Sequence, residues 1–258
     1  MMPSLSSKKS GIKNPFVDPE QLEIGYWAAQ EEYDCNTLAR LSIMAEKIGL
    51  ESVLTSDHMQ PWFDTNGHSG FAWSWMAATA AMTERIALGT GVTAPDRYHP
   101  ALIAQMFASF DEMFPNRAML GLGAGEALNS RPLGIIWPSK LERIDRLKEA
   151  AEIIRMVWES GGRRVSYGGQ HFRLNKLKLY SPPQNKIPIY IAAGGKSSAK
   201  LAGRYGDGLV TTGDPLNEEN KELYNAALEE ARKARGPGPS LGGWLKSIFH
   251  MTRIAIKR

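Results

Sequence analysis

Short apolar runs alternate along this chain with longer segments in which apolar residues recur at helical spacing. Helical spacing is clearest in residues 38–48, which stop at Gly49, and in residues 141–158. Six runs have the length and buried character of strands: residues 23–28, 52–55, 86–89, 118–122, 187–192 and 208–212. Strands that alternate with helices form parallel sheets with right-handed crossovers. The pattern therefore predicts an α/β fold, either an open doubly wound sheet or a (β/α)8 barrel with only six units.

Two segments break the alternation. Residues 165–172 contain two polar-apolar runs around a Gly-Gly pair, which predicts a small hairpin inserted on the surface of the fold. After residue 235, a cluster of Gly and Pro leads into a basic stretch in which no further strand-helix unit is expected. We therefore divide the chain into an N-terminal extension at 1–22, a truncated barrel domain at 23–235 and an atypical basic tail at 236–258. Six strands would leave two open sheet edges, so we expect low stability.

Composition narrows the class of protein. A length of 258 residues with 43% hydrophobic content is enough to bury one large core. The one cysteine, Cys35, has no partner for an internal disulfide, which suits a reducing cytosol. The chain has no signal-peptide core and no run of about 18 apolar residues, so we expect a cytoplasmic protein without a membrane partner. The 31 basic and 27 acidic residues are interspersed, which argues against a nucleic-acid partner.

Ionisable side chains follow two of the predicted strands. Asp57 and His58 come just after residues 52–55, and Glu126 closes the glycine-rich turn after residues 118–122. The carboxyl ends of parallel strands meet at one edge, where ligands bind and reactions occur, so these side chains are candidates for one acid-base pocket. Taken singly, each has a plainer explanation, because an Asp-His pair on a loop often caps a helix and a glycine-rich turn often serves the backbone.

Other aromatic and histidine residues are assigned no chemistry. Trp73, Trp75 and Met76 recur at helical spacing and are expected to pack in a core. His68 and His99 lack companions at the spacing of metal ligands, so no metal site is predicted.

Several motifs occur in one order along residues 24–213. They are Ile24-Gly25-Tyr26, residues 56–62, Arg97-Tyr98-His99-Pro100-Ala101, Pro115-Asn116-Arg117, residues 123–129 and Ala192-Ala193-Gly194-Gly195. With this series, the chain resembles the luciferase-like superfamily of flavin and deazaflavin oxidoreductases, in particular the branch that uses coenzyme F420. The resemblance implies a TIM (β/α)8-type barrel, here incomplete, with the cofactor lying over the carboxyl ends of the strands.

The resemblance implies hydride transfer from a CH–OH group to the deazaflavin of coenzyme F420. The substrate would be a secondary alcohol or a sugar phosphate such as glucose 6-phosphate. In this comparison His58 is the base for the hydroxyl proton, Glu126 is the proton donor, Trp62 contacts the substrate and Glu31 is a second pocket glutamate. A histidine suits the base role because its unperturbed pKa is about 6.5. Glu126 needs burial or a neighbouring negative charge to hold a proton near neutrality.

The resemblance also implies a set of cofactor-binding residues. Asn129 matches a residue that contacts the ring, and Gly91–Val92 falls where the family has a non-proline cis peptide bond. Asp57 is assigned to the same set and can also orient the neighbouring histidine. Gly194 and Gly195 precede a predicted helix and offer backbone N–H groups to the cofactor's phosphate.

Two departures from the family leave the substrate open. Asp214 stands where the sugar-phosphate dehydrogenases have a phosphate-binding lysine, and a carboxylate repels a phosphate at close range. The C-terminal quarter of the family's barrel has no recognisable counterpart. Two alternatives therefore stay open beside the dehydrogenase: an FMN-dependent luciferase-like monooxygenase and a non-catalytic truncated remnant. The resemblance also implies a homodimer.

Overall fold

The computed structural model describes residues 24–65, 67–212, 217–235 and 248–251. The N-terminal extension at 1–22, Asp214 and most of the tail at 236–258 lie outside these ranges. The main sheet contains seven strands: β1 (Gly25–Ala28), β2 (Ser52–Thr55), β3 (Ala87–Thr90), β4 (Ala118–Leu122), β7 (Ile189–Ala192), β8 (Gly208–Thr212) and β9 (Ile248–Met251).

Helices connect the strands of this sheet. They are α1 (Cys35–Lys47), α2 (Ala72–Ala81), α3 (Pro100–Met113), α4 (Ala127–Ser130), α5 (Lys140–Glu159), α6 (Lys196–Tyr205) and α7 (Glu218–Arg235), with a 3-10 turn, η2 (Arg131–Leu133). None of the helices in the described part of the chain is long and apolar enough to cross a membrane.

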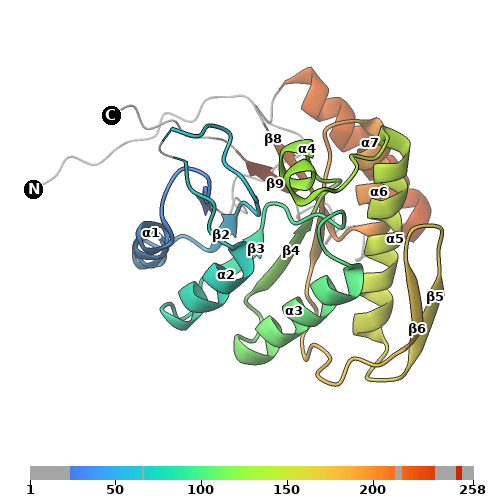
Figure 1. Ribbon diagram of the computed structural model, residues 1–258, viewed down its shortest axis with the longest axis horizontal. Helices are drawn as coiled ribbons and strands as arrows, with labels where there is room; N and C mark the ends of the chain where they lie inside the picture. Colours follow the sequence, from blue (N-terminus) through green and yellow to red (C-terminus); the bar gives the residue numbers. More distant parts are fainter. Residues whose placement is uncertain (1–23, 66, 213–216, 236–247, 252–258) are drawn as a thin grey trace, which may run out of the picture.

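The order of the strands decides between the two predicted architectures. Neighbours in the main sheet follow the chain, β1-β2-β3-β4-β7-β8-β9, and every pair is parallel. A doubly wound sheet would reverse its strand order at a switch point, and this sheet does not. The sheet curves and its helices follow one another around the outside (Figure 1). The fold is therefore an incomplete (β/α)8-type barrel.

All six predicted strands are present, and the predicted hairpin is confirmed. It consists of β5 (Val165–Gly168) and β6 (Arg173–Leu177), which pair antiparallel beside α5. No further strand-helix unit was expected after residue 235, and the structure adds one strand there, β9, which pairs in parallel with β8. Residues 248–251 are mostly apolar, but the run is short and lies in a basic stretch after a cluster of Gly and Pro, and its place in the sheet depends on pairing with β8.

Alternate residues of the strands face the surrounding helices. Leu88, Leu120 and Ile189 are fully buried and belong to one hydrophobic cluster with Phe107 of α3 and Ile153 of α5. Burying side chains of this size contributes roughly 1.5–3 kcal/mol each, so this layer fixes the helices against the sheet.

The predicted packing role of Trp73, Trp75 and Met76 in α2 is confirmed. Trp75 and Met76 are only 4% and 1% exposed and belong to the hydrophobic cluster. Trp73 is half-buried, and its ring centroid lies 4.3 Å from that of Tyr98, in the segment that leads from β3 to α3. Through this contact α2 packs against a segment close to the candidate site.

Carboxylates hold the loops at the amino-terminal edge of the sheet. Glu46 at the end of α1 accepts backbone N–H groups of residues 84–86, just before β3. Asp111 at the end of α3 accepts backbone N–H groups of residues 184 and 185, which lead into β7. These bonds satisfy loop N–H groups that no strand pairs. The amino-terminal edge is thus stabilised by structural contacts, whereas the candidate chemistry lies at the opposite edge.

Candidate functional site

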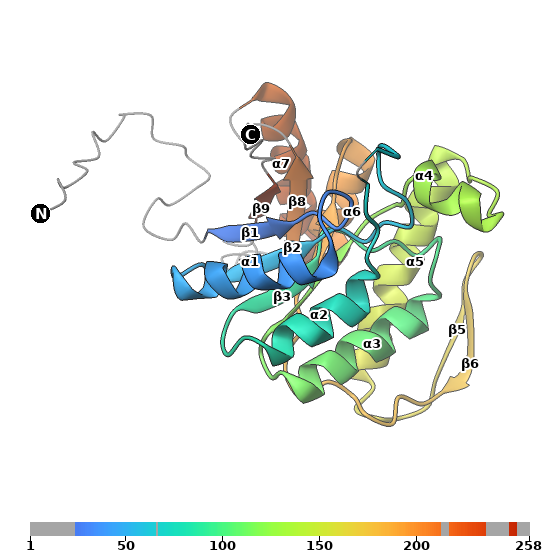
Figure 2. The same cartoon turned by 60° about the vertical axis from the view of Figure 1, so that its left-hand side comes forward.

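The segments that follow β1, β2, β3 and β4 meet at the carboxyl edge of the sheet. Their contacts join them directly: Ser56 after β2 contacts Glu31 after β1, and Thr93 after β3 contacts Asp57 after β2. The segment from β2 to α2 and the short helix α4 lie at the same end of the molecule in both views (Figures 1 and 2). The structure therefore brings together side chains from well-separated parts of the chain.

His58 and Glu126 form the centre of this site. His58 Nε2 lies 3.7 Å from Glu126 Oε2, and the side chains are 13% and 46% exposed. The distance is too long for a direct hydrogen bond, so both groups remain able to bond a third group between them. His58 Nδ1 is buried and has no hydrogen-bond partner within the described residues. The predicted base and proton donor thus lie side by side.

Trp62 lies next to this pair. Its ring centroid is 5.4 Å from that of His58, with the planes tilted by 57°. The indole is 49% exposed, so one face remains available to a ligand. An exposed aromatic ring beside an acid-base pair is suited to covering a small apolar part of a substrate.

Glu31 completes the predicted catalytic set. Ser56 Oγ donates to Glu31 Oε2 and accepts the backbone N–H of Gln30 at 2.8 Å. Gln30 in turn donates from Nε2 to Thr55 Oγ1 at 3.0 Å. This chain of bonds fixes the Glu31 carboxylate against the end of β2.

The surroundings of Glu126 favour its protonated form. Burial is the largest cause and raises the pKa of the Glu126 carboxyl; the His58 side chain lowers it, and the Glu31 and Asp96 carboxylates raise it. The net pKa of Glu126 is raised above its usual range. Because a proton donor must carry its proton near the working pH, this environment suits the role that the resemblance implies for Glu126.

The Asp57 side chain is held by a network that sequence reasoning missed. Its carboxylate accepts from Thr93 Oγ1, from Arg97 Nη2 at 3.0 Å and from Tyr98 OH at 3.3 Å. Burial, followed by the charge of Asp57, raises the pKa of Tyr98 to about 12, so the phenol stays a donor. Both carboxylate oxygens of Asp57 are already bonded to protein groups. The network therefore fixes the loop that carries His58, and the predicted cofactor contact of this side chain stays a prediction.

Asn129 also has a partner that the sequence did not reveal. Its Oδ1 accepts the backbone N–H of Met59 at 2.7 Å, and the side chain is buried. This bond joins α4 to the loop that carries His58. It therefore helps to hold His58 and Glu126 next to each other. The amide nitrogen of Asn129 makes no hydrogen bond within the described residues, which leaves it available for the predicted ring contact.

The remaining predicted cofactor residues lie along the same edge. The Gly91–Val92 peptide bond is cis, as the resemblance implies. Val92 packs tightly on Gly123, where an added Cβ would lie 2.3 Å from Val92 Cγ2. Gly194 and Gly195 come directly before α6, and an added Cβ at either position would meet nothing within 4 Å. The start of α6 is thus open beside the sheet edge.

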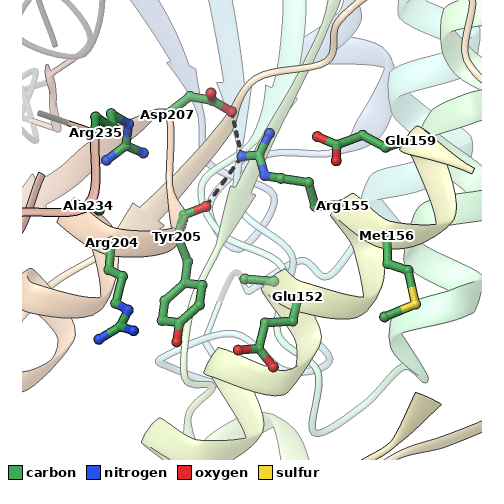
Figure 3. A pocket seen from close by; sticks show the side chains of 10 residues that line it. Glu152, Arg155, Met156, Glu159, Arg204, Tyr205, Asp207, Ala234 and Arg235 are labelled. Carbon is green, nitrogen blue, oxygen red and sulfur yellow. Dashed lines mark hydrogen bonds and ion pairs between the residues drawn. The ribbon is translucent and has the colours of Figure 1, made fainter. Parts of the chain in front are cut away.

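A hollow of about 580 Å³ lies away from these residues. It is formed by α5, α6 and α7, and Figure 3 shows Arg155 reaching across it. Arg155 donates to Asp207 Oδ2 at 2.8 Å, and Asp207 directly precedes β8 at the amino-terminal edge. Arg235 donates to the carbonyl oxygens of Gly203 and Gly206. Both arginines are therefore committed to holding the loop from α6 to β8.

Within the part of the chain that the structure describes, no three His, Cys, Asp or Glu side chains are grouped so that they could hold a metal ion.

The fold and the site define a barrel-type β/α protein with an acid-base pair at the carboxyl edge of its sheet. The chain belongs to the luciferase-like monooxygenase family, whose sequence profile matches residues 22–252. That match continues past the predicted domain boundary at residue 235 and includes β9.

Curated relatives carry a more specific name. The chain is 43% identical over 208 residues to the F420-dependent glucose-6-phosphate dehydrogenase of Microbacterium testaceum, covering 80% of this chain and 60% of the relative. It is 44% identical over 239 residues to the protein of the same name from Nocardia farcinica, covering 91% of this chain and 68% of the relative. The chain thus spans about 60% of the length of the first of these relatives.

Solved structures show the same architecture. An F420-dependent secondary alcohol dehydrogenase, in complex with an F420-acetone adduct, matches with a TM-score of 0.80 and 38% identity. The match covers 89% of this chain and 68% of that one. The coenzyme F420-dependent tetrahydromethanopterin reductase of Methanopyrus kandleri matches with a TM-score of 0.73 over 89% of this chain and 65% of that one. Its identity is 23%, so this second likeness bears on the fold alone.

Proposed function

We propose that this chain carries the cofactor ring site and the acid-base pair of an F420-dependent oxidoreductase acting on a CH–OH group. The observation that carries the proposal is the approach of His58 Nε2 to within 3.7 Å of Glu126 Oε2 at the carboxyl edge of the sheet. The names of the relatives at 43–44% identity, and of the solved structure at 38% identity, support the same chemistry.

The residues at this edge fit a flat ring with a phosphate-bearing tail. Val92, seated on Gly123, presents an apolar wall, and the amide nitrogen of Asn129 is an available donor. The open space at Gly194 and Gly195, before the N-terminus of α6, leaves room for a phosphate against backbone N–H groups. When bound, F420 supplies a deazaflavin ring that accepts a hydride.

The protein's own part in the reaction is to move two protons and to orient the substrate. His58 Nε2 accepts the proton of the substrate hydroxyl, a step worth about 10²–10⁴-fold in rate when the base is well placed. Glu126 Oε2 holds the proton that compensates charge on the cofactor side, and its raised pKa keeps that proton available. Trp62 covers the substrate beside the base. The buried network around Asp57 keeps the base-bearing loop in place.

We propose a substrate that carries a CH–OH group, without a choice between two classes of compound. Secondary alcohols and sugar phosphates such as glucose 6-phosphate both present a CH–OH group to His58. Position 214, which the resemblance links to phosphate binding, lies outside the described residues. The homodimer stays a prediction.

The first test is titration of the purified 258-residue chain with F420, followed by fluorescence, with FMN in a parallel titration. Micromolar binding of F420, and loss of the visible band of the oxidised cofactor when isopropanol or glucose 6-phosphate is added, would support the proposal. Binding of FMN alone would favour the monooxygenase. A folded sample that binds neither cofactor would contradict the proposed function for this chain.

A further inference from the structure

Asp96, besides raising the pKa of Glu126, is linked to the turn that carries this residue. It comes from the segment after β3, and its Oδ2 accepts a hydrogen bond from Ser130 Oγ at the end of α4. The same Ser130 Oγ lies 3.2 Å from the backbone carbonyl oxygen of Glu126. Asp96 is thus linked through one serine to the residue that carries the proposed proton donor.

The backbone next to Glu126 is shaped around the same carboxylate. Gly125 has a φ of +81°, a conformation that favours glycine. A Cβ at Gly125 would lie 2.7 Å from Asp96 Oδ1 and 2.8 Å from its Oδ2, so the carboxylate lies flat against the glycine. Any larger residue at position 125 would displace Asp96. The turn and the carboxylate therefore fit each other.

One oxygen of Asp96 has no partner within the described residues. Its Oδ1 is buried and makes no hydrogen bond there, although a buried carboxylate oxygen without a donor is unfavourable. Local conflicts of this kind are expected at functional sites rather than in structural loops. An asparagine at position 96 could accept the same hydrogen bond from Ser130 without burying a charge. The negative charge of Asp96 therefore needs an explanation of its own.

We propose that Asp96 is a positioning residue for Glu126, fixing through Ser130 and Gly125 the turn from which the Glu126 carboxyl projects and facing it with a negative charge. The inference rests on the proposed function, because it assigns Asp96 a role toward the proposed proton donor. Its effect is to keep that donor oriented toward His58 and protonated until the reaction needs the proton.

The charged groups that act on Glu126 are Glu31 after β1, His58 after β2 and Asp96 after β3. Burial and the Glu31 carboxylate raise the pKa of Glu126 together with Asp96, whereas His58 lowers it. A nearby like charge disfavours ionisation of a carboxyl, so removal of the Asp96 charge must lower the pKa of Glu126.

The decisive measurement uses the protein without cofactor. Carbon NMR of protein labelled at the glutamate carboxyls, with the Glu126 resonance assigned by its loss in Glu126→Gln, follows the titration of this group directly. In Asp96→Asn, which keeps the shape of the side chain, the midpoint for Glu126 should fall by about half a pH unit. Asp64→Asn removes an exposed negative charge from the loop between β2 and α2 and should leave the midpoint unchanged. An unchanged midpoint in folded Asp96→Asn protein would overturn the proposal.

A second variant keeps the test decisive if Asp96→Asn does not fold. A kinetic measurement with F420 bound tests the same role in the proposed reaction. Should Asp96→Asn not fold, Asp96→Ser removes the same charge, and its midpoint is expected to fall in the same way. With F420 bound, Asp96→Asn should lower kcat on the order of 10-fold with KM little changed, and should move the alkaline loss of activity to lower pH. If the wild-type chain does not bind F420, the proposed function fails, but the NMR midpoint still decides whether Asp96 acts on Glu126.

Discussion

Arg97 and Asp57 form an ion pair of 3.0 Å in which the side chains are only 4% and 1% exposed. Arg97 also donates from Nη1 to the backbone carbonyl of Asp57 at 2.7 Å. The pair joins the segment after β3 to the loop that carries His58. A buried pair of this kind matters mainly because the removal of one partner leaves the other charge without compensation.

Replacement of Arg97 by methionine should therefore destabilise the fold strongly. We expect Arg97→Met to lower the free energy of unfolding by about 3–5 kcal/mol, measured by urea denaturation, because Asp57 would remain buried and unpaired. The matched control is Arg146→Met, which breaks a partly exposed pair with Glu142 on the surface of α5. That change should cost only about 0–1 kcal/mol. Equal costs for the two variants would show that Asp57 does not depend on Arg97 for its charge balance.

The base role of His58 predicts a loss of rate without a loss of cofactor. His58→Asn should lower kcat by about 10²–10⁴-fold, because the substrate hydroxyl would lose its proton acceptor. F420 affinity, followed by fluorescence, should change only a few-fold, since the Asp57 network and Asn129 remain. His68→Asn alters an exposed histidine of the same loop and serves as the control. Equal activity of the two variants would remove His58 from the mechanism.

The electrostatics of Glu126 predict a pH-dependent effect on stability. The pKa of Glu126 is raised in the folded protein, from an ordinary value of 4.5. The stability that this carboxyl contributes is therefore fully present below that ordinary value and is lost as the pH rises through the raised pKa. Glu126→Gln, which cannot ionise, should be more stable than the wild type at pH 8 and equal to it at pH 4, by urea denaturation.

The control for this change is Glu112→Gln, at an exposed position near the end of α3. Its stability relative to the wild type should not vary in this direction between the two pH values. A Glu126→Gln variant that becomes less stable than the wild type as the pH rises from 4 to 8 would contradict the prediction.

The strands could be predicted because each is a short apolar run bounded by polar residues or glycine. Their ends were less predictable. Residues 187–192 predict one strand, but β7 begins at Ile189, since Pro188 has no N–H to donate to a sheet ladder. Ile187 is nevertheless buried, at 3% exposure, so the apolar signal is real although it extends beyond the strand. β9 was not predicted because its short apolar run lies in a basic stretch after a cluster of Gly and Pro, and pairing with β8 gives it a place in the sheet.

The placement of the candidate catalytic residues at one edge of the sheet could also be predicted, but their hydrogen-bond and ion-pair partners could not. The sequence identifies Arg97 only as part of a motif, and nothing next to Asp57 shows that its charge partner follows a different strand. Asp96 and Ser130 are likewise unremarkable in sequence, and their contact arises only when the segments after β3 and β4 meet. Contacts between loops depend on the order of the strands, which local patterns do not determine.

The open space at the start of α6 predicts that a substitution there changes F420 affinity without lowering the free energy of unfolding. At Gly194 an added Cβ meets nothing within 4 Å, and the backbone is not in the left-handed region. Gly194→Ala should therefore leave the free energy of unfolding unchanged or raise it by roughly 0.4–1 kcal/mol. The new methyl group would occupy the space proposed for the cofactor's phosphate, so F420 affinity should fall about tenfold or more.

Gly168 provides the matched control for this substitution. An alanine there also meets nothing within 4 Å, but Gly168 lies in β5, on the surface hairpin beside α5. Gly168→Ala should have the same effect on stability and none on F420 binding, compared by urea denaturation and by fluorescence titration. Loss of affinity in Gly194→Ala alone would place the phosphate at the start of α6. Unchanged affinity in both variants would place the phosphate elsewhere and leave the role of His58 and Glu126 to be judged by their own tests.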